Sequence, residues 1–218
     1  MTEIESEVMK ELSRASLLKN FHKIKIESVD KSDGPLFLKA IEKSRDELSP
    51  HFKWARPEVN WDMQHANKFV EKLAAKNFGQ EHFKVMYDCE MIGYVGIFPL
   101  KYPKQAEIAL WITTGYHNLG VGKFVVDETV KRCFEVRKDV LLQCQHLFNN
   151  EWSARLAEKS HFTYVGQFTG HHVQDPYCNN IGSISRWIRI NNSVSTTEDP
   201  LEDPVFYLRD EKFRKKLI

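Results

Sequence analysis

The sequence predicts a mixed α+β protein, in which helices flank a mostly antiparallel sheet. Three observations predict this class: three strand-like segments follow one another mid-chain, a helical segment then separates two strand-like segments, and two further strands close the pattern. Short turns join antiparallel neighbours, whereas a strand-helix-strand crossover gives a parallel pair. We therefore expect an antiparallel early sheet with one parallel crossover near its centre.

The first part of the chain alternates between helical and extended patterns. Thr2 and Glu5 have capping-box spacing, and apolar residues recur at helical intervals after them. The segment FHKIKIESV alternates between apolar and polar residues, as a half-buried strand does. The predicted elements are a helix over 2–19, a strand over 21–29, a helix over 36–48 that ends before Pro50, and a helix over 60–78 that Gly79 ends.

The second part of the chain supplies most of the sheet. Its first two apolar segments are separated only by Cys89 and Glu90, which predicts a hairpin or a tight meander. The segment DVLLQCQHL is apolar enough for a central strand covered on both faces. The predicted elements are strands over 82–88, 91–100 and 106–114, a helix over 121–136, a strand over 139–147, a helix over 151–160, and strands over 162–173 and 182–190.

Length and composition favour one domain with two extensions. The chain has 218 residues, of which 42% are hydrophobic, enough for one well-filled core. We assign residues 1–20 to an N-terminal helical extension and residues 21–191 to the domain. Residues 192–218 form a polar, proline-containing linker and a short basic tail.

Charge and hydropathy exclude several classes of partner. Lysine and arginine number 31 against 30 acidic residues, and no basic stripe with interleaved aromatics is present, so no nucleic-acid partner is expected. The longest apolar run, MIGYVGIFPL, is too short to cross a bilayer, and the N-terminus is acidic where a signal peptide would be basic. The four cysteines have no CxxC spacing. We expect a cytoplasmic protein with free thiols, no metal and no membrane association.

The segment HNLGVGK suggests a phosphate-binding loop between a strand and a helix. A dinucleotide fingerprint needs a third glycine where Val125 stands. A Walker loop would begin at Gly115 but lacks the lysine and hydroxyl pair after Gly120. What remains is a loop whose glycines, Gly120 and Gly122, let a diphosphate approach main-chain N–H groups at a helix N-terminus. Two glycines alone would equally suit an ordinary loop at a helix start.

The surrounding sequence resembles the GNAT acetyltransferase superfamily, whose acetyl-CoA loop is [QR]-x-x-G-x-[GA]. Residues 117–122 match both small positions, with His117 in place of Gln or Arg. The stretch from Phe83 to Phe168 is similar to the RimJ/RimL-type branch, through IGYVGI, AEIALWI, the glycine loop and NEWSARLAEKSHF. Trp54 also stands in the place of that branch's first-helix tryptophan.

This resemblance implies a GNAT-like sheet with splayed central strands and acetyl-CoA as cosubstrate. The pantetheine arm would lie along the strand end as an extra strand, and an N–H near Ile112 would stabilise the oxyanion. The diphosphate would bind the main chain of the glycine loop. The implied cofactor-binding residues are Ile112, Thr113, Thr114, His117, Leu119, Gly120, Val121, Gly122, Lys123, Asn150 and Ser153.

The resemblance also implies a group that protonates the departing thiolate. Many relatives use a tyrosine at the position of Ala157 in this chain. We expect Ser153 to replace it as a catalytic residue, with Asn150 holding the pantetheine arm. The alternative for Ser153 is an ordinary serine in the first turn of a helix.

Two residues are candidates for the general base. Glu107 lies on the central strand, on the side of Ala109 and Trp111, where relatives often place a glutamate that acts through water. His172 occupies the position of a glutamate on a later strand of RimL-like enzymes, and histidine titrates near neutrality. The alternative for His172 is a solvated histidine pair with His171. An α-amine has a pKa of about 8, so its deprotonation needs little driving force.

Two further features depart from the family pattern or leave a choice open. His161 replaces a glycine at a helix C′ position, which predicts a left-handed backbone there. Three tryptophans could line an acceptor cleft or fill the core: Trp54, Trp61 and Trp111.

The function implied is acetyl transfer from acetyl-CoA to a primary amine by direct attack on the thioester. We expect the acceptor to be the N-terminal α-amine of a peptide or protein. The alternatives are a small amine, polyamine or antibiotic acceptor, and a non-catalytic acyl-CoA-binding module. The resemblance implies a monomer or a homodimer.

Overall fold

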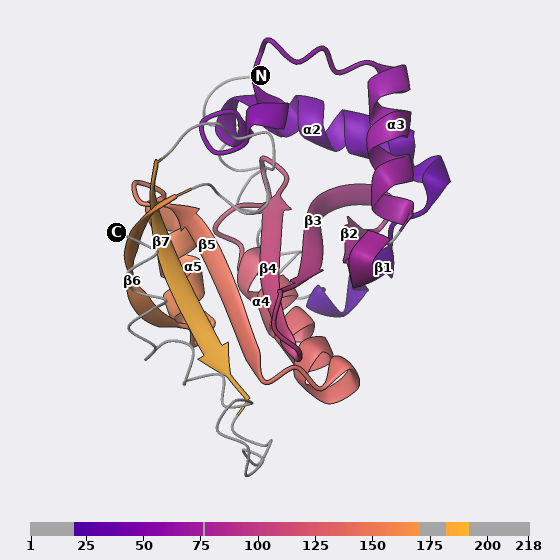
Figure 1. Ribbon diagram of the computed structural model, residues 1–218. Helices are drawn as coiled ribbons and strands as arrows, with labels where there is room; N and C mark the ends of the chain where they lie inside the picture. The colour runs from indigo at the N-terminus through magenta and orange to yellow at the C-terminus, as the bar shows by residue number, and fades with distance from the viewer. Residues whose placement is uncertain (1–19, 76, 171–181, 192–218) are drawn as a thin grey trace. The chain divides into compact units, whose positions relative to one another are not determined.

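A computed structural model describes residues 20–75, 77–170 and 182–191 (Figure 1). The predicted extensions 2–19 and 192–218 therefore lie outside the described residues. The chain divides into two compact units. The first unit comprises Met1–Pro50, Trp54–Gly96 and Leu110–Val125, and the second comprises His51–Lys53, Ile97–Ala109 and Val126–Ile218.

Within the described residues, seven strands form one mixed, mostly antiparallel sheet, and four α-helices accompany it. The sheet order is β1-β2-β3-β4-β5-β7-β6. The strands are β1 (Ile24–Ser28), β2 (Glu81–Tyr87), β3 (Glu90–Pro99), β4 (Gln105–Ile112), β5 (Leu141–Leu147), β6 (Thr163–Gly170) and β7 (Gly182–Ile190). The helices are α2 (Gly34–Leu48), α3 (Met63–Ala74), α4 (Val121–Arg132) and α5 (Glu151–Lys159). The predicted fold class is confirmed.

The parallel crossover lies where the sequence predicts it, between β4 and β5. Their pairing joins Gln105–Glu107 to Leu141–Gln143, although β4 continues to Ile112 and β5 to Leu147. Three other pairs are antiparallel: β1 with β2, β5 with β7, and β6 with β7. The splay of the central strands that the family resemblance implies stays a prediction.

In the first unit, α2 and α3 pack against each other, as Figure 1 shows. The helix α2 begins at Gly34, with Pro35 in its first turn, where a missing N–H costs nothing. A Cβ on Gly34 would lie 1.9 Å from the side-chain oxygen of Asn67 on α3, so only glycine permits this contact. The Asp62 side chain caps α3 by accepting the N–H of His65 at 2.8 Å.

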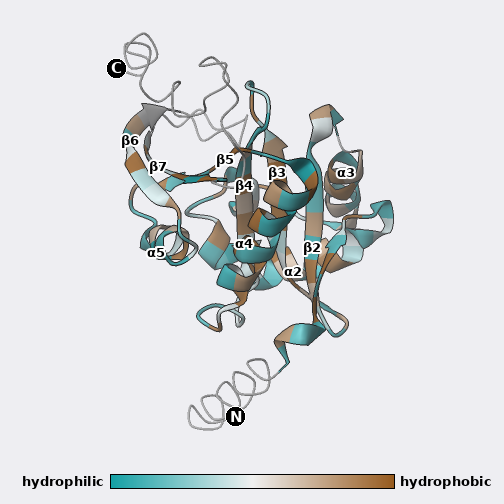
Figure 2. Ribbon diagram, turned by 90° about the horizontal axis from the view of Figure 1, so that it is seen from below, coloured by the Kyte–Doolittle hydropathy of each residue, from teal (hydrophilic) through white to brown (hydrophobic). Residues whose placement is uncertain are grey.

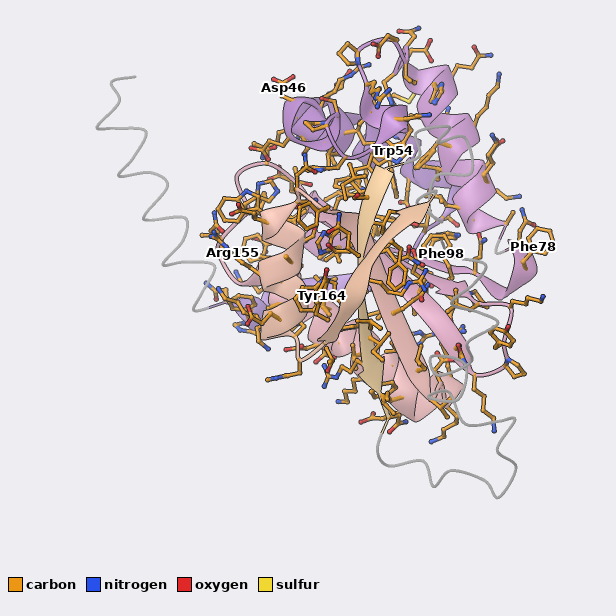
Figure 3. The ribbon with its side chains drawn as sticks, turned by 60° about the vertical axis from the view of Figure 1, so that its left-hand side comes forward. Asp46, Trp54, Phe78, Phe98, Arg155 and Tyr164 are labelled. Atoms are coloured by element: carbon orange, nitrogen blue, oxygen red, sulfur yellow. The ribbon has the colours of Figure 1, made fainter. Side chains whose placement is uncertain are left out.

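An aromatic cluster fills the core of the first unit. The Trp54 ring, labelled in Figure 3, lies 5.9 Å from Trp61 and 6.3 Å from Trp111, measured between ring centroids. Trp61 and Trp111 are both buried, and the Trp61 indole donates to the carbonyl of Trp54 at 2.6 Å. Of the two alternatives for these tryptophans, core packing accounts for Trp61 and Trp111.

The strands of the central sheet are apolar, and the helices are amphipathic. In β3, seven successive residues from Met91 to Ile97 are buried. Figure 2 shows the hydrophobic residues along β3, whereas α4 alternates between hydrophilic and hydrophobic positions. A continuous apolar run is typical of a strand that is covered on both faces.

In the second unit, α5 packs on β5 and β6 and ends in a Schellman motif. The N–H of Phe162 donates to the carbonyl of Ala157 at 2.9 Å, and the N–H of His161 donates to the carbonyl of Glu158 at 3.0 Å. His161 has φ of 61°, which confirms the left-handed conformation predicted there. Phe162 is buried, so its packing role in the motif is present.

Several predicted element boundaries are wrong by a few residues. The first strand begins at Ile24 because Phe21–Lys23 form a 3₁₀ turn. The helix predicted over 60–78 spans Met63–Ala74 instead, since Asp62 caps its start and Phe78 adopts a left-handed φ of 54°. Phe78 is 93% exposed and projects at the periphery in Figure 3.

Two later boundaries also differ from the prediction. The helix predicted over 121–136 becomes a π-helical turn at Cys133–Arg137, which left-handed Lys138 ends. The strand predicted over 162–173 begins at Thr163, and its last predicted residues lie outside the described part of the chain. Apolar periodicity marks the buried face of an element but not where its main-chain hydrogen bonding stops.

Candidate active site

The loop between β4 and α4 has the backbone that a phosphate-binding loop needs. Gly115 and Gly120 have positive φ values of 94° and 84°, and Asn118 has one of 60°. The helix α4 begins at Val121, and the N–H of Phe124 donates to the Gly120 carbonyl at 3.0 Å. The N–H groups of a helix's first turn have no carbonyl partner within the helix, so they can bind an anion.

Gly120 of this loop tolerates a side chain poorly. Its φ is one that L-residues rarely adopt, and an added Cβ would lie 3.3 Å from the ring of Phe21. Phe21 in turn packs on Phe124 of α4, with 5.6 Å between ring centroids. The bare main chain at Gly120 therefore fits the approach of a diphosphate, which is a requirement for acetyl-CoA.

Hydrogen bonds from α2 hold the end of β4. The N–H of Thr114 donates to the Ser44 hydroxyl oxygen at 3.0 Å, and the Thr114 hydroxyl donates to the Glu47 carboxylate at 2.8 Å. The same carboxylate lies 2.8 Å from Nδ1 of His117. The other ring nitrogen of His117, Nε2, lies 2.6 Å from the carbonyl oxygen of Ile112.

His117 therefore has both ring nitrogens engaged within the chain. The next residue after Ile112, Thr113, donates its N–H to the carbonyl of Ile92 on β3 at 2.9 Å. The hydrogen-bonding groups of successive strand residues point to opposite edges. The Ile112 carbonyl that His117 contacts therefore points away from β3. His117 thus lies at the edge of β4 opposite β3. The cofactor-binding role implied for His117 stays a prediction; in this conformation its ring lies between Glu47 and Ile112.

A second group of side chains braces the loop near Tyr116. The Glu90 carboxylate accepts from the Lys43 ammonium at 2.8 Å and from the Tyr116 hydroxyl at 2.7 Å. Burial acts to raise the pKa of Glu90, but these hydrogen bonds hold it below its ordinary value. Burial and the bond to Glu90 raise the pKa of Tyr116, which stays a neutral donor.

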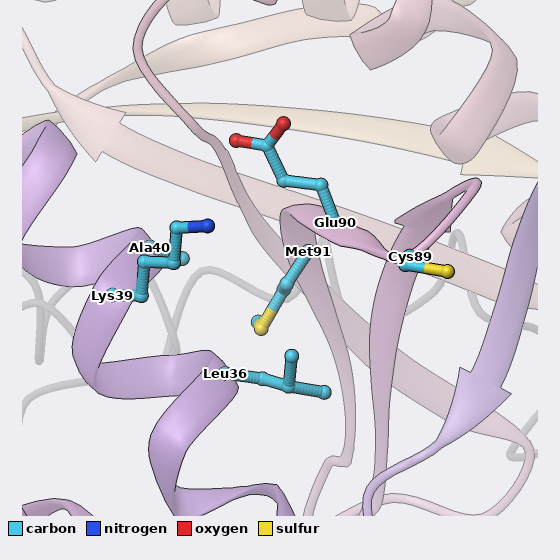
Figure 4. A pocket seen from close by; sticks show the side chains of 6 residues that line it. All are labelled: Leu36, Lys39, Ala40, Cys89, Glu90 and Met91. Atoms are coloured by element: carbon cyan, nitrogen blue, oxygen red, sulfur yellow. The ribbon is translucent and has the colours of Figure 1, made fainter.

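A small pocket lies beside this group, between α2 and the turn from β2 to β3. Figure 4 shows its lining, formed by Leu36, Lys39, Ala40, Cys89, Glu90 and Met91. The carboxylate of Glu90 is already held by Lys43 and Tyr116, and the Cys89 thiol is free and exposed. The pocket contains none of the residues predicted to be functional.

In the second unit, Glu107 lies in a buried polar network. Its side chain has no solvent exposure, and one carboxylate oxygen accepts from Gln143 at 2.7 Å and from Gln145 at 2.9 Å. Gln143 and Gln145 lie on one face of β5, because side chains of a strand alternate between faces. A carboxylate that accepts two amide N–H groups has a fixed orientation.

A cation lies near the same carboxylate. Arg186 is paired with Gln145 across β5 and β7. Its guanidinium lies 4.7 Å from the ring centroid of Phe168. Burial lowers the pKa of Arg186, and the charge of Glu107 acts in the opposite direction. Among the described residues of this network, Glu107 thus has a positive charge close by.

The structure gives Asn150 a clear structural role. Asn150 is the N-cap of α5, and its side-chain oxygen accepts the N–H of Ser153 at 3.1 Å. The cap fixes the main chain at Ser153, in the first turn of the helix. Ala157, where many relatives have tyrosine, is buried.

The predicted site residues fall into two groups. The first unit brings together the strand end and loop from Ile112 to Lys123, and the second unit contains Glu107, Asn150 and Ser153. His172 lies outside the described residues, so its role as a base stays a prediction.

Four side chains that contact these groups were not among the predicted site residues: Ser44, Glu47, Gln143 and Gln145. The two glutamines were detectable, because they stand at alternate positions of an apolar strand segment. Nothing in the sequence linked Ser44 and Glu47 to a loop some 70 residues away.

No group of histidine, cysteine and acidic side chains that could hold a metal ion occurs within 20–75, 77–170 and 182–191. No helix of the described part is long and apolar enough to cross a membrane.

Comparison with known proteins identifies the class. The profile of the family described as acetyltransferase (GNAT) domain matches residues 24–163. The chain therefore belongs to the GNAT acetyltransferases and is an acetyl-CoA-dependent N-acetyltransferase, as the glycine loop and its context predicted. None of the proteins with curated functions matches the sequence.

Solved structures share the fold at low sequence identity. RimL, described as a ribosomal L7/L12 alpha-N-protein acetyltransferase in complex with coenzyme A, is 18% identical with a TM-score of 0.67, covering 79% of this chain and 96% of its own. A ribosomal-protein-S5-alanine acetyltransferase from Vibrio fischeri is 15% identical with a TM-score of 0.66, covering 78% and 94%. A spermidine N-acetyltransferase from Vibrio cholerae, in complex with CoA and spermine, is 13% identical with a TM-score of 0.61, covering 78% and 96%.

Proposed function

We propose that this enzyme acetylates the N-terminal α-amine of a peptide or protein. The amine nitrogen attacks the thioester carbonyl carbon of acetyl-CoA, the carbon–sulfur bond breaks, and the amide and coenzyme A thiol are released. Two of the three structures compared above are described as acetyltransferases of ribosomal proteins, which supports this acceptor.

The observation that carries the choice of acceptor is the charge around Glu107. A polyamine carries several ammonium groups and calls for several carboxylates. The buried network of the second unit instead holds one carboxylate, two neutral amides and the nearby Arg186 guanidinium. One ammonium group matches one carboxylate, whereas a second ammonium would meet the guanidinium.

Each proposed catalytic group has one task. Glu107 takes the proton of the ammonium, directly or through a water molecule, and its two amide donors keep the carboxylate oriented for this. The main chain from Leu119 to Lys123 binds the diphosphate at the start of α4. Ser153 donates a proton or a hydrogen bond to the departing thiolate. Acetyl-CoA supplies the activated acetyl group.

An acceptor screen with free-thiol detection tests this proposal. We expect release of coenzyme A with peptides that have a free N-terminus, and none with the same peptides after chemical N-acetylation. Peptides with a lysine but a blocked N-terminus separate α-amine from side-chain transfer. If spermidine or another small amine is turned over and free N-terminal peptides are not, the proposed acceptor is wrong.

A further inference from the structure

Two side chains on the last turns of α2 hold the segment that leads into the glycine loop. The Ser44 hydroxyl donates to the Ala40 carbonyl at 2.7 Å and accepts the Thr114 N–H at 3.0 Å. The Glu47 carboxylate binds the Thr114 hydroxyl and the His117 imidazole, each at 2.8 Å. In Figure 1 the end of β4 points toward α2, where these contacts occur.

His117 extends this attachment to within three residues of Gly120. Its ring lies between the Glu47 carboxylate and the Ile112 carbonyl, and both partners offer oxygen acceptors. A neutral imidazole has one N–H, so it donates to one partner and contacts the other. Contacts on both sides restrain the ring and the main chain that carries it. The loop is therefore tied back to the strand end at Ile112 and to α2.

We propose that Ser44 and Glu47 are positioning residues for acetyl-CoA. They hold the glycine loop in the conformation in which its main-chain N–H groups bind the diphosphate. The inference rests on the proposed function of residues 119–123 as the diphosphate site. A loop that is ordered before binding does not lose conformational freedom when the cofactor arrives, so the affinity is higher.

The two anchors differ in environment, which sets the expected size of each effect. Ser44 is 1% exposed, so replacing it by alanine leaves the Thr114 N–H without its buried acceptor. The Glu47 side chain is 48% exposed, and solvent weakens its interactions with Thr114 and His117. Loss of the Ser44 hydroxyl should therefore weaken cofactor binding more than loss of the Glu47 carboxylate.

The test measures the dissociation constant and KM of acetyl-CoA, with kcat, in matched variants. We expect both constants to rise about ten-fold in Ser44→Ala and about three-fold in Glu47→Ala, while kcat at saturating acetyl-CoA stays within about two-fold. Glu47→Gln should remain close to wild type, because its amide oxygen still accepts from Thr114 and His117. Glu42→Ala removes an exposed acid from the same helix and should change neither constant.

A double-mutant cycle shows whether Glu47 acts through His117. We expect Glu47→Ala to have a smaller effect in a His117→Ala background than in wild type. Unchanged acetyl-CoA affinity in both Ser44→Ala and Glu47→Ala would overturn the inference, as would fully additive effects of Glu47→Ala and His117→Ala. If Ser44→Ala does not fold, the exposed Glu47 variants decide the matter alone.

The same measurements separate this inference from the proposed function. Wild type that fails to bind acetyl-CoA, or Gly120→Trp that still binds it tightly, would contradict the placement of the diphosphate on the loop. A different outcome would contradict only the positioning role. In that outcome wild type binds acetyl-CoA, Gly120→Trp does not, and the Ser44 and Glu47 variants bind it as wild type does.

Discussion

The side-chain amide of Gln143 donates a 2.7 Å hydrogen bond to the carboxylate of Glu107. The two residues are paired on adjacent strands in the parallel part of the sheet. Gln145 donates a second bond to the same carboxylate oxygen. This arrangement holds a buried acid in one orientation on a strand that leads directly to the glycine loop. The proposed role of Glu107 as general base depends on this orientation.

Replacing Glu107 by glutamine should impair catalysis rather than cofactor binding. General base catalysis contributes about 10²- to 10⁴-fold, so we expect kcat to fall by about 10² or more. The KM of acetyl-CoA should change little. The pH–rate profile should also lose the limb that belongs to the general base, which steady-state kinetics across pH will measure.

His172→Ala is the comparison that assigns the base. If Glu107→Gln keeps the wild-type pH profile and His172→Ala loses its acidic limb, the base is His172. If neither variant changes the profile, neither residue is the essential base.

Gln145→Leu removes one amide donor and should reduce kcat less than Glu107→Gln does.

Gly120→Ala should weaken acetyl-CoA binding. A non-glycine residue at this left-handed φ costs about 1–2 kcal/mol, and the new Cβ would contact the Phe21 ring. We expect the loop to shift, with a rise of about ten-fold in the acetyl-CoA dissociation constant measured by calorimetry. Gly122→Ala is the matched control, because Gly122 is the second residue of α4 and the family motif accepts alanine there. Equal effects of the two substitutions would contradict the special role of Gly120.

The ion pair of Lys84 and Asp33 should be important for stability. The Lys84 ammonium lies 2.6 Å from an Asp33 carboxylate oxygen, and the two side chains are 13% and 5% exposed. The other Asp33 oxygen accepts the Asp30 N–H at 2.7 Å. Lys84→Met leaves a buried charge unpaired, so we expect a loss of about 3–5 kcal/mol in the free energy of unfolding, measured by denaturant titration.

An exposed ion pair provides the control for that measurement. Lys23 and Asp88 lie 3.9 Å apart with side chains 46% and 63% exposed. Lys23→Met should change the free energy of unfolding by less than about 1 kcal/mol. Similar losses in Lys23→Met and Lys84→Met would contradict burial as the cause.

His82 should make the protein less stable at mildly acidic pH. Burial lowers the pKa of His82 from 6.5 to about 4. Between these two values the unfolded chain binds more protons than the folded one, so the free energy of unfolding falls as the pH drops through this window. The full pKa shift corresponds to a loss of about 3 kcal/mol in the free energy of unfolding. No such loss is expected above about pH 6.5.

Denaturant titrations from pH 7 to pH 4 will measure this loss. The Tyr94 hydroxyl lies 2.6 Å from Nδ1 of His82, and His82→Gln keeps a polar partner for it without a group that titrates. We expect a shallower pH dependence in this variant than in wild type. Burial also lowers the pKa values of His51 and His146, so some dependence should remain. An identical slope in wild type and His82→Gln would contradict the assignment to His82.

The sequence by itself determined the order of elements, the parallel crossover and the position of the glycine loop. Apolar periodicity and turn residues are local signals, so they gave the type of each element from the first strand to the last. The left-handed backbone at His161 could be predicted for the same reason, since a helix C′ position constrains its own residue. Element ends were less accurate, because capping by Asp62 and the left-handed turn at Phe78 compete with periodicity.

Only the tertiary structure decided how the loop and the buried acid are held. Ser44 and Glu47 reach Thr114 and His117 across 70 residues of chain, and His117 turns out to bridge a carboxylate and a strand carbonyl. Such contacts depend on the packing of α2 on the strand end, which no local pattern encodes. The sequence thus determines which groups are present, whereas the fold decides which of them meet.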